Sequence, residues 1–189
     1  MIVEVAVGLA AAALAGGLVR VLRRPAPPPL PPPAPEPPRS AGPRGLKVRD
    51  VITGPGLEVA LGGVLELDED GFVLRAFRTL EHEERWLVQL DREGRRLALG
   101  APSAEVPAGS VPEALPIGGR TVRLERRGVA QVRSEGEGLP AMQCARYAVL
   151  AERAGRTLVV IDPEGGARLA LALDELDPRG LDVLRGGDV

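Results

Sequence analysis

The side chains that most often carry chemistry are scarce in this 189-residue chain, which contains one histidine and one cysteine. The histidine stands in Glu81-His82-Glu83-Glu84, where an imidazole beside carboxylates could hold a metal ion or act as a general base. Neighbouring residues of an extended chain point to opposite sides, so these side chains do not converge on one ion. We therefore predict that the segment is a solvent-exposed loop between two strands.

The single cysteine, Cys144, has no second thiol and cannot form an internal disulfide. One cysteine and one histidine also fall short of the roughly four ligands that a structural zinc site needs. Catalysis by a Ser-His-Asp or Cys-His arrangement would have to pass through His82 alone. We predict that Cys144 is a small, largely buried and unreactive side chain in a strand. We also predict that the protein has no catalytic residues, metal site or cofactor, and is not an enzyme.

Two arginines could bind an anion, because Arg85 and Arg156 occupy equivalent positions in an internally repeated pattern. Trp86, next to Arg85, is the third binding candidate. The alternative is that both arginines are outward-facing strand residues with local partners in Glu84 and Glu152. Packing in the core is the role expected for the four aromatic residues, Phe72, Phe77, Trp86 and Tyr147.

The first 24 residues are predicted to form a membrane anchor. Residues 2–19 are apolar or small except for Glu4, and as a helix they would span roughly 27 Å, close to the thickness of a bilayer core. Three arginines follow the apolar run and none precedes it, which is the reverse of a secretory signal peptide. The positive-inside rule then places the rest of the chain in the cytoplasm, at the inner membrane. The alternative is a soluble, Ala-rich helix.

Residues 25–45 are predicted to be a linker, because Pro25–Pro43 contains eleven of the nineteen prolines. Such a run adopts polyproline II and acts as a stiff spacer. The alternative is a docking site for a domain that reads proline-rich motifs, with Leu30 as a contact. Residues 46–189 then form one domain with 19 basic and 24 acidic residues, a net charge of -5 that gives no basic footprint for nucleic acid.

Strands and hairpin turns dominate this domain. Three segments place Asp first and Gly fourth, the pattern of a type I turn that closes a hairpin. They are Asp68-Glu69-Asp70-Gly71, Asp91-Arg92-Glu93-Gly94 and Asp162-Pro163-Glu164-Gly165. Short strand-like runs lie beside them: Val64–Leu67, Arg85–Leu90, Arg156–Ile161 and Arg168–Leu171. No helical period of ten or more residues lies between Leu46 and Leu173, and residues 174–184 could add one short helical turn.

The domain is predicted to consist of two similar halves, residues 46–104 and 115–189. The matches, in chain order, are Gly56-x-x-Val59-x-Leu61 with Gly119-x-x-Val122-x-Leu124, Phe77-x-x-Leu80 with Tyr147-x-x-Leu150, Arg85–Gly94 with Arg156–Gly165, and Arg96–Leu99 with Arg168–Leu171. The offset grows from 63 to 72 residues and never reverses, as a tandem duplication with loop insertions requires. The alternative is two unrelated meanders that share turn chemistry.

Several segments together resemble a known family. They are Leu46–Ile52, Gly63–Phe72, Arg85-Trp86-Leu87, Gly128-Val129-Ala130 and Val183–Asp188. In this order they are similar to the bacterial domain of unknown function 4178. The resemblance implies a β-rich domain, often encoded beside membrane proteins and polyamine-enzyme-like genes, with no catalytic residues to carry over. The chain departs from the family pattern at Arg49, where a glycine is usual, and at Leu74–Phe77, a stretch usually richer in Trp and Tyr.

These observations predict an all-β fold of antiparallel strands, in which two tandem halves form a barrel or a sandwich behind one N-terminal transmembrane helix. The expected function is that of a non-catalytic adaptor, which binds another protein of a membrane-associated complex. The alternative is a module for a small anionic ligand, or one related to polyamines, with its site in the groove between the two halves and Arg85, Trp86 and Arg156 as binding candidates.

Overall fold

The computed structural model describes residues 43–153 and 155–186, which contain eleven strands, one short 3-10 helix and no α-helix. The elements are β1 (Val51–Gly54), β2 (Leu57–Glu69), β3 (Phe72–Thr79), β4 (Trp86–Gln89), β5 (Leu97–Pro102), β6 (Ala114–Ile117), β7 (Arg120–Gly136), β8 (Cys144–Ala151), β9 (Arg156–Pro163), β10 (Leu169–Leu176), η1 (Pro178–Gly180) and β11 (Asp182–Leu184). The predicted anchor and nearly all of the predicted linker lie outside the described residues. Within the two described ranges, no helix has the length and apolar character to cross a membrane.

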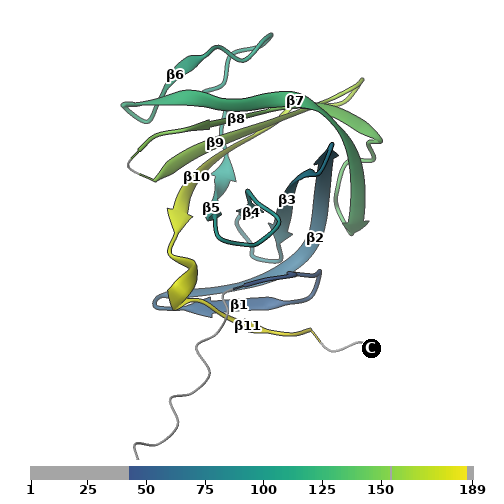
Figure 1. Cartoon of the computed structure of the whole chain (residues 1–189). Coiled ribbons are helices and arrows are strands. Elements are labelled where there is room, and N and C mark those ends of the chain that lie inside the picture. Colours follow the sequence, from purple (N-terminus) through teal and green to yellow (C-terminus); the bar gives the residue numbers. More distant parts are fainter. Residues whose placement is uncertain (1–42, 154, 187–189) are drawn as a thin grey trace, which may run out of the picture. The chain divides into compact units, whose positions relative to one another are not determined.

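Eight of the strands close into an antiparallel barrel (Figure 1). Around the barrel they follow the order β2, β3, β4, β5, β10, β9, β8, β7, and pairing of β2 with β7 completes the circle. Closure satisfies the backbone hydrogen bonds of strands that would otherwise be edges. The predicted antiparallel all-β fold is confirmed, and of the two predicted forms the structure is a barrel.

The barrel contains two meanders of the same design. In the first, β1 leads into β2–β5, and in the second, β6 leads into β7–β10. Each leading hairpin turns at a glycine with positive φ, Gly56 or Gly119, and each following strand carries one bulge, at Gly62 in β2 and at Glu125 in β7. Gly119 follows Gly56 by 63 residues, and Glu125 follows Gly62 by the same number. The turns and the bulges are therefore equivalent positions of the two halves.

Two of the sequence matches between the halves are wrong for individual residues, although they join corresponding strands. Phe77 packs on the outer side of the barrel wall and Tyr147 on the inner side. Ala98 likewise points inward, whereas Ala170 points outward. Side chains alternate between the two faces of a strand, so an alignment that is out of phase by an odd number of residues exchanges the faces.

Apolar side chains fill the barrel interior. This interior core consists of Leu65, Leu67, Leu74, Ala76, Trp86, Val88, Leu90, Ala98, Ala130, Val132, Ala145, Tyr147, Val149, Val159, Ile161, Leu171 and Leu173. Both halves contribute to it, and each large side chain buried in this way stabilises the fold by about 1.5 to 3 kcal/mol. The expected core role of the aromatic residues is confirmed, because Phe77, Trp86 and Tyr147 are buried and Phe72 packs against this core.

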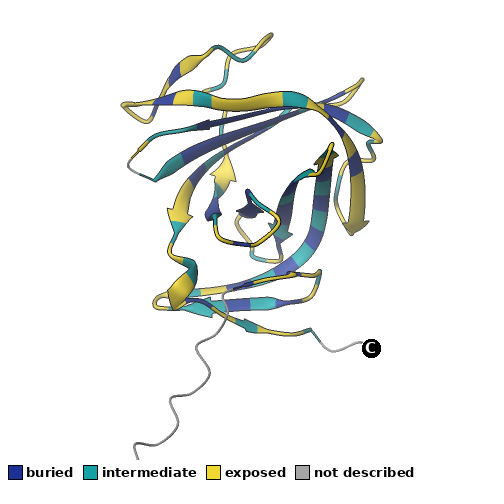
Figure 2. Ribbon diagram, in the orientation of Figure 1, coloured by how far each residue is buried: buried dark blue, intermediate teal, exposed yellow. Residues whose placement is uncertain are grey.

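Two further cores lie on the outer faces of the barrel, one for each half. The first outer core packs β1 over β3–β5 and contains Leu46, Ile52, Val59, Leu61, Phe77, Leu87, Leu97, Leu99 and Leu181. The second outer core packs β6 over β8–β10 and contains Leu115, Ile117, Val122, Ala148, Leu150, Leu158, Val160 and Ala170. Figure 2 shows buried residues along β8 and β9 and a mostly exposed β7.

A buried carboxylate joins the two ends of the described chain. Asp50 is 2% exposed, and its oxygens accept hydrogen bonds from the backbone N–H groups of Lys47 and Gly186. Arg185 forms an ion pair with the same carboxylate at 2.7 Å and donates to the carbonyl oxygens of Arg44 and Gly45. We call this group the Asp50 clasp, because it fastens the segment before β1 to the segment after β11.

The three hairpin turns lie between the strands that the sequence predicts, with two differences. The third turn is Pro163–Gly166 rather than Asp162–Gly165, because Pro163 still belongs to β9 and its carbonyl oxygen accepts from the N–H of Gly166. The turn between β2 and β3 has only Asp70 and Gly71 as central residues, because Glu69 pairs with Phe72. Both central residues have positive φ, 48° and 91°, which is a type I′ turn rather than the predicted type I. Type I′ matches the right-handed twist of the strands, and Gly71 adopts such a φ without strain. The predicted short helical turn near the C-terminus is confirmed as η1.

Candidate ligand-binding site

A cleft of about 440 Å³ opens on the outer side of the second half. Its floor is formed by apolar residues of β8 and β9, including Ala148 and Val160, and Val129 of β7 borders it with 58% of its surface exposed. We call this the outer cleft. Its lining residues are Gly109, Ser110, Val111, Arg127, Gly128, Val129, Arg146, Tyr147, Ala148, Val160, Asp162 and Arg168.

Positive charge dominates the outer cleft, where three arginines face one aspartate. Among the described residues, Arg127 has no carboxylate partner. Arg146 is 78% exposed and reaches Asp162 only at 3.4 Å. The guanidinium groups of Arg127 and Arg146 are therefore available to an anion, although the domain as a whole is acidic.

One arginine builds the wall of the outer cleft. Arg168 donates hydrogen bonds to the carbonyl oxygens of Pro107, at 2.7 Å, and Gly109, at 2.5 Å, and pairs with Asp162 at 3.0 Å. Its side chain is only 20% exposed. These contacts hold the segment that precedes β6 against β9 and β10, so the shape of the cleft is fixed before a ligand binds.

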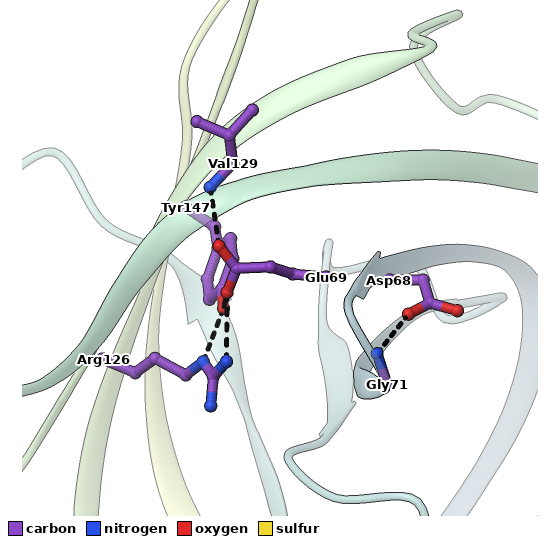
Figure 3. A network of polar contacts seen from close by, with 6 residues as sticks. All are labelled: Asp68, Glu69, Gly71, Arg126, Val129 and Tyr147. Atoms are coloured by element: carbon purple, nitrogen blue, oxygen red, sulfur yellow. Dashed lines mark hydrogen bonds and ion pairs between the residues drawn. The ribbon is translucent and has the colours of Figure 1, made fainter.

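A polar network joins the end of β2 to β7 and β8 (Figure 3), and two of its members, Val129 and Tyr147, also line the outer cleft. The carboxylate of Glu69 accepts hydrogen bonds from the Tyr147 hydroxyl at 2.6 Å, from Arg126 at 3.1 Å and from the backbone N–H of Val129 at 3.2 Å. The carboxylate occupies the space beside Gly128 where any other residue would place its Cβ. A glycine at position 128 is therefore required for this network.

Aromatic contacts complete the network. The rings of Phe72 and Tyr147 stack with centroids 5.7 Å apart, and the Arg126 guanidinium lies 4.1 Å from the centroid of Phe72. The hydrogen bonds from Tyr147 and Arg126 lower the pKa of Glu69 below its usual value. Burial, followed by the bond to Glu69, raises the pKa of Tyr147 to about 12. The Tyr147 hydroxyl thus stays protonated at neutral pH and donates to the Glu69 carboxylate, which holds β8 to the end of β2.

This pKa gives a direct test, because Tyr147 is the only tyrosine in the chain. Absorbance at 295 nm should show tyrosinate forming with a midpoint near pH 12 in the folded protein, against about 10 in urea. Since the folded pKa is raised, the stability that this group contributes is fully present below about pH 10 and is lost as the pH rises through about 12.

The Glu69→Gln variant supplies the control for this titration. Removing the negative charge beside the hydroxyl should move the folded midpoint of Tyr147 below that of the unchanged protein. A folded midpoint near 10 in the unchanged protein would contradict the described network.

The structure does not bring the predicted binding candidates together. Arg85 precedes β4 and pairs with Glu81 at 3.3 Å, whereas Arg156 begins β9 and pairs with Asp174 at 3.2 Å. Strands β5 and β10 lie between them, a separation of about 14 Å at roughly 4.8 Å per strand. Trp86 is 2% exposed and points into the interior core. Both arginines have local partners, as the alternative interpretation expected, but the partners are not Glu84 and Glu152.

The other chemically active side chains lie apart from the cleft. His82 is exposed in the loop between β3 and β4, which confirms the predicted position. Cys144 begins β8, which confirms the predicted strand, but it is half-buried rather than largely buried. In residues 43–153 and 155–186, no three His, Cys, Asp or Glu side chains are grouped so that they could hold a metal ion.

A groove between the two halves does exist, at the seam of β2 and β7, with a volume of about 1110 Å³. Neither Arg85 nor Arg156 lines it. Its charged lining residues are Lys47, Arg49, Arg78, Glu81, Glu135 and Glu137. Equal numbers of positive and negative side chains give this groove no preference for a ligand of one sign, in contrast to the outer cleft.

The sequence offered little warning of the outer cleft. Arg127 and Arg146 lie 19 residues apart in the chain and become neighbours only through the pairing of β7 with β8. One signal was the basic run Arg126-Arg127 before Gly128-Val129, which falls in the mostly exposed strand β7.

No protein-family model, curated protein or solved structure matches the chain. The resemblance to the domain of unknown function 4178 therefore stays a prediction.

Proposed function

We propose that the β domain is a non-catalytic binding module and that its outer cleft binds a small anionic ligand with an apolar body. The observation that carries this proposal is the combination of an apolar floor with two arginines, Arg127 and Arg146, that lack strong carboxylate partners. The volume of about 440 Å³ lies in the range of small-molecule sites, roughly 300 to 1,000 Å³.

The sequence supplies the cellular setting of this proposal. An apolar segment at residues 2–19, followed by arginines and a proline-rich linker, would hold the module on the cytoplasmic side of a membrane. A module in this position could report the presence of its ligand to a membrane protein, so the adaptor hypothesis and the ligand hypothesis are compatible. A partner protein remains part of the proposal, and its identity is left to co-purification from membranes.

Binding should depend on the two available arginines. Isothermal titration calorimetry of the full chain in detergent should detect small carboxylates with apolar bodies and should not detect amines of the same shape. The double variant Arg127→Ala/Arg146→Ala should bind at least tenfold more weakly, because each hydrogen bond to a charged group is worth about 1.5 to 3 kcal/mol.

Arg133→Ala is the matched control for these variants. Arg133 is an exposed arginine of the same strand that does not line the cleft. Equal losses in the control and the double variant, or equal binding of amines and carboxylates, would refute the outer cleft as an anion site.

A further inference from the structure

The first half of the barrel contains a counterpart of the outer cleft. Counted from the matched bulges, Val64 and Glu66 of β2 correspond to Arg127 and Val129 of β7. In the first half, Val64 pairs with Phe77 and Glu66 pairs with Arg75. In the second half, Arg127 pairs with Ala148 and Val129 pairs with Arg146. Phe77 is therefore equivalent to Ala148, and Arg75 is equivalent to Arg146. All four residues of each set line the cavity of their own half.

In the first half, the protein's own side chains occupy this place. The Phe77 ring is fully buried in the first outer core, which also contains Leu46. The Arg75 guanidinium binds the Glu66 carboxylate at 2.7 Å. The remaining cavity measures about 280 Å³. An aromatic ring and an ion-paired carboxylate, which line the same cavity, therefore complete the first half.

The second half lacks both the aromatic ring and the carboxylate, but it keeps the arginine that binds the carboxylate. Ala148 replaces the ring, Val129 replaces the carboxylate, and the cavity is about 440 Å³. The receiving arginine is still present as Arg146, whose nearest carboxylate, Asp162, is 3.4 Å away and is shared with Arg168. Arg127 adds a second cation where the first half has Val64.

We infer that the outer cleft takes a small aromatic carboxylate, whose ring lies over Ala148 in the place of the Phe77 ring and whose carboxylate pairs with Arg146 in the place of Glu66. This inference rests on the proposed function and names the ligand class of the same site. The segment pinned by Arg168 closes one side of the cavity, and the cavity has the volume of a small-molecule site, so a free molecule is assigned rather than a protein chain.

The test compares four probes by isothermal titration calorimetry on the full chain in detergent: 3-phenylpropanoate, hexanoate, 3-phenylpropylamine and an acidic peptide that contains Phe beside Glu. We expect 3-phenylpropanoate to bind at least tenfold more tightly than hexanoate and the amine to show no binding. If hexanoate binds as tightly as 3-phenylpropanoate, the aromatic inference fails and the proposed anion site stands. If neither the two small carboxylates nor the peptide bind, the aromatic inference and the proposed function both fail. If only the peptide binds, the assignment to a free small molecule is overturned.

Two variants rebuild the first half's arrangement in the second half. Ala148→Phe should fill the space for the ring, and Val129→Glu should give Arg146 an internal carboxylate, so each should weaken 3-phenylpropanoate at least tenfold. Val129 is 58% exposed, so this substitution remains informative even if the larger side chain at position 148 disturbs folding. Gln131→Glu adds the same charge two residues further along β7, outside the cleft lining, and should change the affinity less than twofold. An unchanged affinity in Val129→Glu, or an equal loss in Gln131→Glu, would overturn the inference.

Discussion

A chain that ends at Ala104 should not fold into a stable half-barrel. Such a chain keeps β1–β5 but loses the partners of β2 and β5, which in the complete domain are β7 and β10. It also exposes the inward side chains of the first half, among them Leu65, Leu74 and Trp86, which the second half covers. Thermal unfolding followed by circular dichroism should show no cooperative transition, and a hydrophobic dye should bind strongly.

The matched control for this truncation is a complete chain that is cut by a protease within residues 103–113. This segment connects β5 to β6 and lies outside the barrel strands, so the cut leaves every strand pairing intact. The two fragments should stay associated and unfold together. A soluble, cooperatively unfolding product of residues 1–104 would show that the halves do not depend on a shared core.

The second large effect is expected at the Asp50 clasp. Asp50→Ala removes the acceptor of the Lys47 and Gly186 backbone N–H groups and the buried partner of Arg185. Breaking such a buried, charge-assisted network costs about 3 kcal/mol, which lowers the melting temperature of a domain of this size by roughly 6 to 12 °C. Differential scanning calorimetry of the variant and the unchanged protein measures the difference.

The contacts of the clasp also predict which variants lose more stability. Arg185→Ala should destabilise less than Asp50→Ala, because the Arg185 side chain is 54% exposed and the Asp50 carboxylate keeps its two backbone donors. Arg179 of η1 is exposed, and its backbone N–H donates a hydrogen bond to Asp177. Arg179→Ala should therefore leave the melting temperature nearly unchanged. If Asp50→Ala and Arg179→Ala melted alike, the clasp would have no role in stability.

Local sequence signals predicted the local structure well. The Asp-to-Gly turn patterns marked three hairpins, and the apolar runs between them marked the strands that they join. These signals work because turn residues and alternating side chains respond to contacts within about ten residues. The closure of the barrel was not determined by such signals, since the pairing of Gly63 with Gly136 joins residues far apart in the chain.

The sequence did not reveal the outer cleft, because the alignment of the two halves was shifted by one residue at Phe77. The sequence match makes Phe77 equivalent to Tyr147 because both are aromatic. The register set by the bulges at Gly62 and Glu125 makes Phe77 equivalent to Ala148 instead. Only the second alignment shows that a large side chain of one half is replaced by a small one in the other. Matching by residue type favoured the wrong partner, because a bulge changes which face of the wall each residue occupies.

The clasp places the beginning and the end of the domain side by side, with the Arg185 guanidinium 2.8 Å from the carbonyl oxygen of Arg44. A short peptide could therefore join residue 186 to residue 44, and the chain could be opened instead between β5 and β6. Such a circular permutant would run from β6 to β11 and then from β1 to β5, with every pairing of the barrel preserved. Because each half begins with the same glycine turn and bulge, the chain of the domain could begin equally well before β1, as it does here, or before β6.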